Sequence, residues 1–245
     1  MTPVLITQFR SPLVHPKTYN KGRVMDHTID DTFVKVRETI TAQTSASEII
    51  NVDVQNHHLV LDDIVYDTAS KYPKEKGAWS RVMFLTKQSD GSRYVLKLMR
   101  DKYVQQGGVD RFVKEVAYQQ VAASCNLAPS ILSFGRCTIH EFLVNNSFYI
   151  LMAHSGQNLS QPIQTEVMRP VYRVHTQLLR NCGLVKIDTS PENIVFNKRT
   201  KRIHLIDFDP GAETEPAMVL RIDREKDNLD KREANIKNRL TPYLK

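Results

Sequence analysis

The chain of 245 residues has few of the features that mark several protein classes. Its three cysteines, Cys125, Cys137 and Cys182, are widely spaced and odd in number, so neither a disulfide framework nor a zinc site is favoured. No apolar run approaches the length of a transmembrane helix, and the N-terminus lacks the apolar core of a signal peptide. We therefore expect no membrane association and a soluble, intracellular protein, cytoplasmic or nuclear.

The excess of positive charge is modest. There are 34 Lys and Arg against 27 Asp and Glu, which gives a net charge of +7 and a pI near 9.3. Aromatic residues are not interleaved with the basic ones as they are in base-stacking surfaces, so nucleic acid is not a favoured partner. An acidic protein substrate or partner fits the same charge. The run at 221–240 mixes both signs and predicts a solvated helix, from about Pro216 to Leu240.

The most informative stretch is LVKIDTSPENIVFNKRTKRIHLIDFDPG at 184–211. Short β-branched runs alternate with polar turns, which predicts a loop followed by a β-hairpin. Asp188 lies at the entrance of this hairpin, Asn193 at the start of its first strand and Asp207 at the end of its second. These side chains can face one cleft, where one carboxylate can orient a hydroxyl and the other oxygens can bind Mg2+.

A lysine and a glutamate upstream lie in two segments with clear secondary-structure patterns. The segment at 80–100 predicts two strands joined by the turn Ser-Asp-Gly-Ser, with Lys97 in the second strand between apolar neighbours. Glu115 lies in the following segment, where apolar residues recur at helical spacing. We expect Glu115 to be the ion-pair partner of Lys97.

The order of these residues resembles the protein kinase-like superfamily. KIDTSPEN stands where protein kinases usually have HRDLKPEN, and IDFD stands where they have DFG. The chain departs from that pattern at Lys186-Ile187, at Ser190 and at Asp209, the last of which is more similar to atypical and small-molecule kinases. Compact kinases of this kind are common among large DNA viruses. The resemblance implies an α+β, two-lobed fold with ATP and Mg2+ as cofactors, in which Asp188 is catalytic, Asn193 and Asp207 bind the metal, and Lys97 and Glu115 clamp the nucleotide.

The same resemblance assigns further nucleotide-binding positions and a domain plan. Residues 77–82, GAWSRV, replace most of the glycine-rich loop, and the site residues there are Gly77, Ala78, Trp79 and Val82. A hinge at about 153–158 would offer the backbone of Ala153 to Ser155 to the base, with Met152 at the rear of the pocket. An unassigned, partly β extension covers 1–70, the β-rich lobe about 71–152, and a minimal helical lobe about 159–245. The last begins with a helix at about 165–182 that Gly183 caps.

Three functional classes remain open at this stage. The first is an active serine/threonine protein kinase that transfers the ATP γ-phosphate to a protein hydroxyl. The second is a nucleotide-binding pseudokinase or scaffold, which the reduced glycine loop and the short chain after Asp207 favour. The third is a small-molecule kinase, suggested by IDFD. A polar hairpin in some unrelated α+β protein is the plainest alternative to all three.

Overall fold

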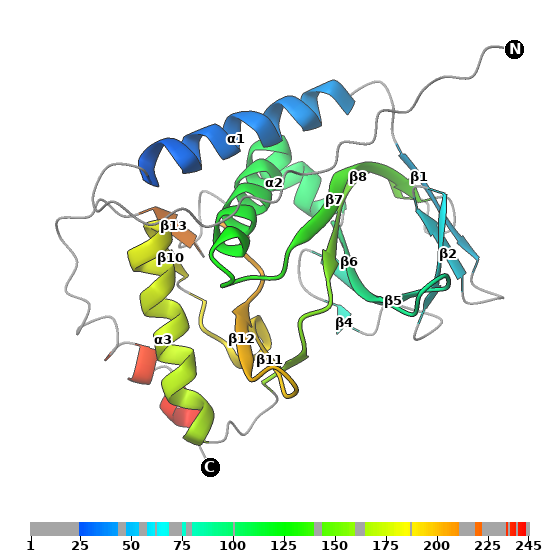
Figure 1. The fold of residues 1–245 in the computed structure, drawn as a ribbon. Helices are drawn as coiled ribbons and strands as arrows, with labels where there is room; N and C mark the ends of the chain where they lie inside the picture. The colour runs from blue at the N-terminus through cyan, green and yellow to red at the C-terminus, as the bar shows by residue number, and fades with distance from the viewer. Residues whose placement is uncertain are drawn as a thin grey trace, which may run out of the picture.

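A computed structural model describes the chain at residues 25–43, 48–53, 58–61, 63–68, 75–76, 80–99, 101–139, 144–159, 165–186, 188–210, 219–221, 234, 236–238 and 240–243. Within these ranges the fold is α+β. An eight-stranded sheet curls round on one side of the molecule, and helices with two small sheets occupy the other side (Figure 1).

The large sheet is mainly antiparallel and follows the order β3-β2-β1-β7-β8-β6-β5-β4, with one parallel pair, β1 and β7. It curls far enough for β3 to pair with β5 as well, which makes the ring of strands seen in Figure 1. The strands are β1 (Glu48–Asp53), β2 (His58–Leu61), β3 (Ile64–Thr68), β4 (Glu75–Lys76), β5 (Ser80–Lys87), β6 (Arg93–Met99), β7 (Ile131–Ile139) and β8 (Val144–Ala153).

The predicted hairpin that carries Lys97 in its second strand is confirmed as β5 and β6, paired from Ser80 with Met99 to Thr86 with Arg93. The turn closes because the N–H of Lys87 donates to the Ser92 carbonyl at 2.8 Å and Gly91 adopts a φ of +69°. Strand β6 also pairs with β8 on its other edge, so it is an interior strand of the sheet. Lys97 is therefore held on a rigid backbone.

The long described helices are α1 (Met25–Ala42), α2 (Asp101–Ser124), which is kinked at Gly108, and α3 (Thr165–Cys182). Residues 234, 236–238 and 240 are helical as well, within the range expected to be a C-terminal helix. The sequence did not indicate α1, which crosses over the upper end of α2 in Figure 1. Val36 and Ile40 of α1 share a buried cluster with Phe112 of α2, and Phe33 meets Tyr118 edge to face at 5.2 Å between ring centroids. The N-terminal region thus contributes a helix that supports α2, in addition to strands that join the main sheet.

The remaining elements surround α3. They are β9 (Gln157–Asn158), β10 (Leu184–Lys186), the 3-10 helix η2 (Pro191–Asn193), β11 (Ile194–Asn197), β12 (Arg202–Leu205), β13 (Val219–Arg221) and the 3-10 helix η3 (Thr241–Tyr243). The predicted loop and hairpin at 184–207 are confirmed by the pairing of β11 with β12. The helix expected from about Pro216 is wrong at its start, because Val219–Arg221 pair with β10 as a strand.

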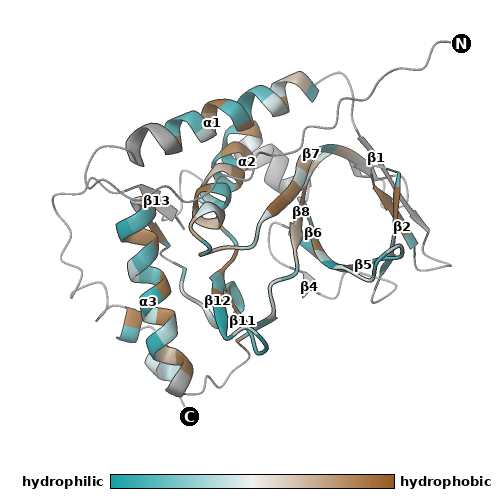
Figure 2. Ribbon diagram, viewed as in Figure 1, coloured by the Kyte–Doolittle hydropathy of each residue, from teal (hydrophilic) through white to brown (hydrophobic). Residues whose placement is uncertain are grey.

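Helix α3 follows its predicted pattern closely. Val167, Val171, Val174 and Leu178 are all buried in one apolar cluster with residues of β11 and β12. The helix ends at Gly183, whose φ of +62° suits a residue without a side chain. Hydrophobic and hydrophilic residues alternate along α3 in Figure 2, so the helix has one packed and one polar side. Among the described helices, none is long and apolar enough to span a membrane.

Candidate functional site

A cavity of about 480 Å3 lies between the curled sheet and the elements around α3. Its lining comes from β5, β6, β8, α2, η2, β11 and the segment after β12, so distant parts of the chain meet there. The lining includes seven of the residues predicted as site residues: Val82, Lys97, Met152, Ala153, Ser155, Asn193 and Asp207. Glu115 and Asp188 lie behind this surface, each bonded to one of its members.

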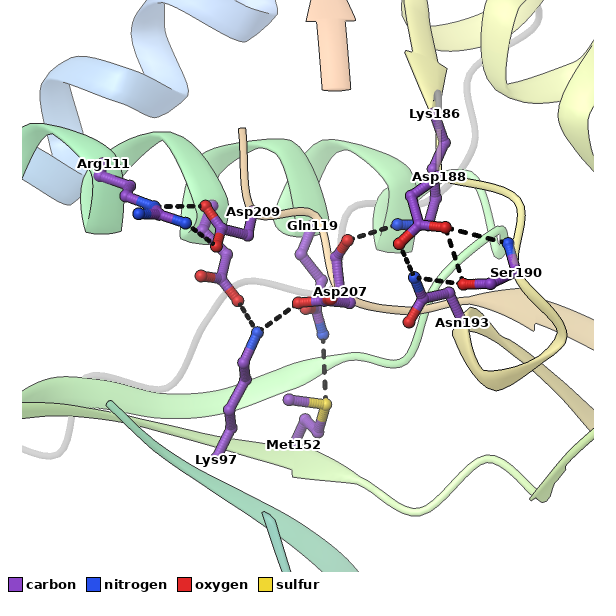
Figure 3. A network of polar contacts seen from close by, with 11 residues as sticks. Lys97, Arg111, Gln119, Met152, Lys186, Asp188, Ser190, Asn193, Asp207 and Asp209 are labelled. Atoms are coloured by element: carbon purple, nitrogen blue, oxygen red, sulfur yellow. Dashed lines mark hydrogen bonds and ion pairs between the residues drawn. The ribbon is translucent and has the colours of Figure 1, made fainter. Parts of the chain in front are cut away.

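Lys97 joins the two sides of the cavity through two ion pairs. Its ammonium lies 2.5 Å from Glu115 Oε1 on α2 and 2.5 Å from Asp207 Oδ1, which follows β12 (Figure 3). The predicted pair with Glu115 is present, and the second pair with Asp207 was not anticipated. Because the Glu115 side chain has no exposed surface whereas that of Asp207 is 42% exposed, Asp207 is the partner that an incoming ligand can reach.

The charges of this triad follow from burial and pairing. Burial alone would lower the pKa of Lys97, but the carboxylates of Asp207 and Glu115 outweigh it and raise the pKa. Burial would raise the pKa of Asp207, yet Lys97 and Lys186 outweigh it and hold the pKa at about 2. Burial raises the pKa of Glu115 to about 6 against the opposing effect of Lys97. At neutral pH the exposed edge of the triad is therefore an ionised Asp207.

Asp207 has a fixed and uncommon backbone. Its φ of +62° lies in the left-handed region, which residues other than glycine rarely adopt. Lys186 of β10 donates from its ammonium to the Asp207 carbonyl oxygen, and the N–H of Ile206 donates to the Asn193 carbonyl at 3.0 Å. Lys186 is itself buried, which lowers its pKa against the effect of Asp207. The residue that departs from the kinase pattern thus fixes the orientation of Asp207.

Asp188 and Asn193 form one polar turn with Ser190. Asp188 Oδ1 accepts hydrogen bonds from the backbone N–H and the hydroxyl of Ser190, at 3.0 and 2.7 Å. Asp188 Oδ2 accepts a hydrogen bond from the Asn193 amide at 2.6 Å. This arrangement follows from the sequence, because Pro191 opens the 3-10 turn that returns Asn193 to Asp188. The side-chain oxygen of Asn193 is left as an acceptor toward the cavity it lines.

Sequence reasoning missed a second buried ion pair, between Arg111 of α2 and Asp209. The guanidinium binds both carboxylate oxygens, at 2.7 and 2.5 Å, and the two side chains are 3% and 8% exposed (Figure 3). Arg111 precedes Glu115 by four residues, so both lie on one face of α2. That spacing was the available signal: one helix face carries a cation and an anion that meet Asp209 and Lys97 respectively.

The connection after β8 passes close to β11. Met152 accepts a 3.5 Å hydrogen bond at its sulfur from Gln119, and the N–H of Ala153 donates to the Ser130 carbonyl at 3.0 Å. Gly156 has a φ of +142°, and a Cβ there would lie 2.4 Å from the carbonyl oxygen of Phe196. Only glycine fits this position without displacing backbone, so the sequence fixes how close the connection comes to β11.

Three predicted residues, Gly77, Ala78 and Trp79, lie outside the described residues. The described part of the chain contains no group of three His, Cys, Asp or Glu side chains that could bind a metal ion by themselves. Asn193 and Asp207 offer two oxygen donors on the cavity wall, which fits Mg2+, because this ion takes few protein ligands and completes its shell with water and phosphate oxygens. No protein-family model matches the chain, and no curated protein matches its sequence.

Proposed function

We propose that the chain is an ATP-dependent phosphotransferase of the protein kinase-like superfamily that acts on a serine or threonine hydroxyl of a protein. One observation carries the proposal: Lys97 bridges Glu115 and Asp207 on the wall of a cavity that Asn193 also lines. Burying a lysine and its carboxylate partners costs desolvation free energy, so such a cluster is expected where its charges serve a function. Phosphoryl transfer uses it, since the lysine positions phosphates and the carboxylates position the lysine and the metal.

The proposed reaction assigns one task to each polar group. The acceptor hydroxyl attacks the γ-phosphorus of ATP, the bond between that phosphorus and the bridging β-phosphate oxygen breaks, and ADP leaves. Asp188 orients the hydroxyl and takes its proton. Lys97 holds the α- and β-phosphates, and Glu115 holds Lys97. When bound, Mg2+ neutralises charge on the phosphates, with Asn193 and Asp207 as its protein ligands.

The kinase-like, two-lobed arrangement is part of the same proposal. The curled sheet with α2 would be the nucleotide-binding lobe, and α3 with the β11–β12 hairpin would be the second lobe. Two features support it: the cavity lies between these parts, and the connection from Met152 to Gly156 runs along its edge. In this arrangement the base would contact the backbone of Ala153 to Ser155.

Nucleotide binding would rearrange the triad. Lys97 now uses one of its hydrogen bonds on Asp207, and Asp207 is ionised because its pKa is about 2. Phosphate oxygens would take the place of Asp207 at Lys97, and the freed carboxylate would bind the metal. The buried contact with Glu115 would persist, since a ligand cannot reach a carboxylate with no exposed surface.

A specific observation favours one alternative, a nucleotide-binding pseudokinase or scaffold. The carboxylate of Asp188 accepts hydrogen bonds from three donors of Ser190 and Asn193, so both of its oxygens already have partners within the turn and are less available to an acceptor hydroxyl. The small-molecule class has less support, because the argument for it was Asp209. The ion pair with Arg111 gives that carboxylate a structural role.

The test combines phosphate transfer with nucleotide binding. Native protein should label itself or a general protein substrate from γ-labelled ATP with Mg2+, and Asp188→Asn should lower the rate by roughly 100-fold or more. Lys97→Met should lower the rate similarly and also reduce Mg-ATP-dependent thermal stabilisation. Lys114→Met is the matched control, since Lys114 is exposed on α2 beside Glu115.

The outcomes separate the classes. If Mg-ATP stabilises the native protein but no label is transferred, the scaffold alternative replaces the enzyme. If Mg-ATP does not stabilise the native protein, or if Lys114→Met lowers labelling as much as Lys97→Met does, the assignment of this cavity as a nucleotide site is wrong.

A further inference from the structure

A second and larger concavity lies on the polar side of α3, away from the cavity of the proposed function. Its volume is about 1120 Å3, and none of its described lining residues is shared with the first cavity. It is built from α3, the loop that follows α2 and the β11–β12 hairpin. Five basic residues line it, and we call it the basic groove: Arg169, Arg173, Arg180, Lys201 and Arg202.

The charge of the basic groove has one sign. Among its described lining residues there is no aspartate or glutamate, and none of the five basic side chains forms an ion pair in the described structure. All five are exposed. Elsewhere in the described chain, cations such as Arg37 and Lys87 have carboxylate partners within 4 Å. Within the described residues, the basic groove therefore presents positive charge that no carboxylate compensates.

The arrangement on α3 makes this more than a solvated helix face. Arg169, Arg173 and Arg180 are spaced by four and seven residues, which places them along one stripe of the helix. Like charges at a spacing of four destabilise a helix by a few tenths of a kcal/mol, and a glutamate at such a position would have the opposite effect. The hairpin adds Lys201 and Arg202 to the same concavity, so charges from two separate elements converge on it.

The floor of the basic groove is apolar. Leu127, Val174 and Ile203 are buried side chains that also line it. A ligand that fills it should therefore carry apolar groups as well as negative charge. Its volume exceeds the range of about 300 to 1,000 Å3 typical of small-molecule sites, which favours a segment of a macromolecule.

We propose that the basic groove docks an acidic segment of a partner protein, in which carboxylates meet the arginines and apolar side chains contact the floor. Arginine suits this task because its guanidinium binds carboxylates with two hydrogen bonds. A single nucleic-acid strand is disfavoured, because such strands need aromatic stacking surfaces and Tyr172 is the one aromatic residue in the described lining. The inference does not depend on the phosphotransferase proposal.

The experiment uses the full chain and a fluorescent peptide in which glutamate and leucine alternate, with binding followed by fluorescence anisotropy. The double variant Arg169→Glu/Arg173→Glu should raise Kd by about tenfold or more, since it removes two charge-assisted contacts. Lys35→Glu/Lys114→Glu is the matched control. It changes the net charge by the same amount on exposed positions of α1 and α2 and should leave Kd within about threefold.

Two further probes test the chemistry of the partner. A peptide of equal charge with serine in place of leucine should bind more weakly, because the floor then gains no apolar contact. An unlabelled single-stranded oligonucleotide should compete less well than the unlabelled acidic peptide. The variant positions are exposed, so melting temperatures should match that of the native chain and report any loss of folding.

Several results would overturn the proposal. They are no saturable binding of the peptide by native protein, equal weakening by the variant and its control, and equal affinity for the leucine and serine peptides. If the oligonucleotide competes more strongly than the unlabelled acidic peptide, the ligand of the basic groove is nucleic acid and not an acidic protein segment.

Discussion

The ion pair between Arg111 and Asp209 makes a quantitative prediction about stability. Both side chains are nearly buried, at 3% and 8% exposure, and two hydrogen bonds of 2.7 and 2.5 Å join them. Removing one member takes the opposite charge away from the other at a buried position, and breaking a buried ion pair in this way typically costs 3 to 5 kcal/mol. We expect Arg111→Met and Asp209→Leu each to lower the free energy of unfolding by roughly that amount, or the melting temperature by about 10 °C.

The double variant Arg111→Met/Asp209→Leu should be more stable than either single variant. It replaces both charges by apolar groups and leaves none unpaired, and such replacements are often neutral. Urea unfolding followed by far-UV circular dichroism would give the four free energies of a double-mutant cycle. Additive effects, in which the double variant loses the sum of the two single losses, would refute the idea that the two side chains depend on each other.

The same cycle carries a functional readout. Asp209 lies two residues after Asp207, and its pairing with α2 holds the segment on which Asp207 meets Lys97. Under the proposed function, the single variants should also lose part of the stabilisation by Mg-ATP. An unchanged ligand-induced shift in melting temperature would mean that Asp207 is positioned without this pair, for example by Lys186 alone.

Three further predictions concern single residues. Burial lowers the pKa of His175 from 6.5 to about 3, so the stability that its neutral form contributes is complete above pH 6.5 and is lost as the pH falls toward 3. At about pH 5 the free energy of unfolding should have fallen by about 2 kcal/mol. Urea unfolding of His175→Leu should no longer show this pH dependence. Gly156→Ala should cost roughly 1 to 3 kcal/mol and weaken nucleotide binding in a thermal-shift assay, because its Cβ would meet the Phe196 carbonyl. Lys186→Met removes the donor to the Asp207 carbonyl and should cost about 1 to 3 kcal/mol of unfolding free energy, together with part of the Mg-ATP stabilisation.

Two of these predictions have a matched control variant, and the third has an outcome that would contradict it. Gly91→Ala is the control for Gly156, because Gly91 also has a positive φ, of +69°, but no atom within 4 Å of the added Cβ. Equal losses at both glycines would mean that φ alone, and not the close approach to β11, is responsible. Lys198→Met, at an exposed turn, is the control for Lys186. If His175→Leu loses as much stability at acid pH as the native chain does, another buried group is responsible for that loss.

Local patterns in the sequence were sufficient for much of the fold. The hairpin β5–β6, the hairpin β11–β12 and helix α3 were predicted from turn residues and from apolar spacing, because these elements depend on contacts between near neighbours. The strand β13 was missed for the opposite reason. Val219–Arg221 lie beside a run of mixed charge that favours a helix, and their strand conformation depends on pairing with β10, more than 30 residues earlier.

The candidate site divides in the same way. The sequence by itself determined that Lys97 lies within a strand and that Asp188, Asn193 and Asp207 lie at the turns and strand ends around a hairpin. The pair of Lys97 with Glu115 was expected from the sequence, but only the tertiary structure decided the two longer-range pairs: Lys97 meets Asp207 across 110 residues, and Arg111 meets Asp209 across 98. The basic groove likewise exists only because a helix and a hairpin bring their cations together. Such long-range pairings depend on how the elements pack, and no local propensity encodes them.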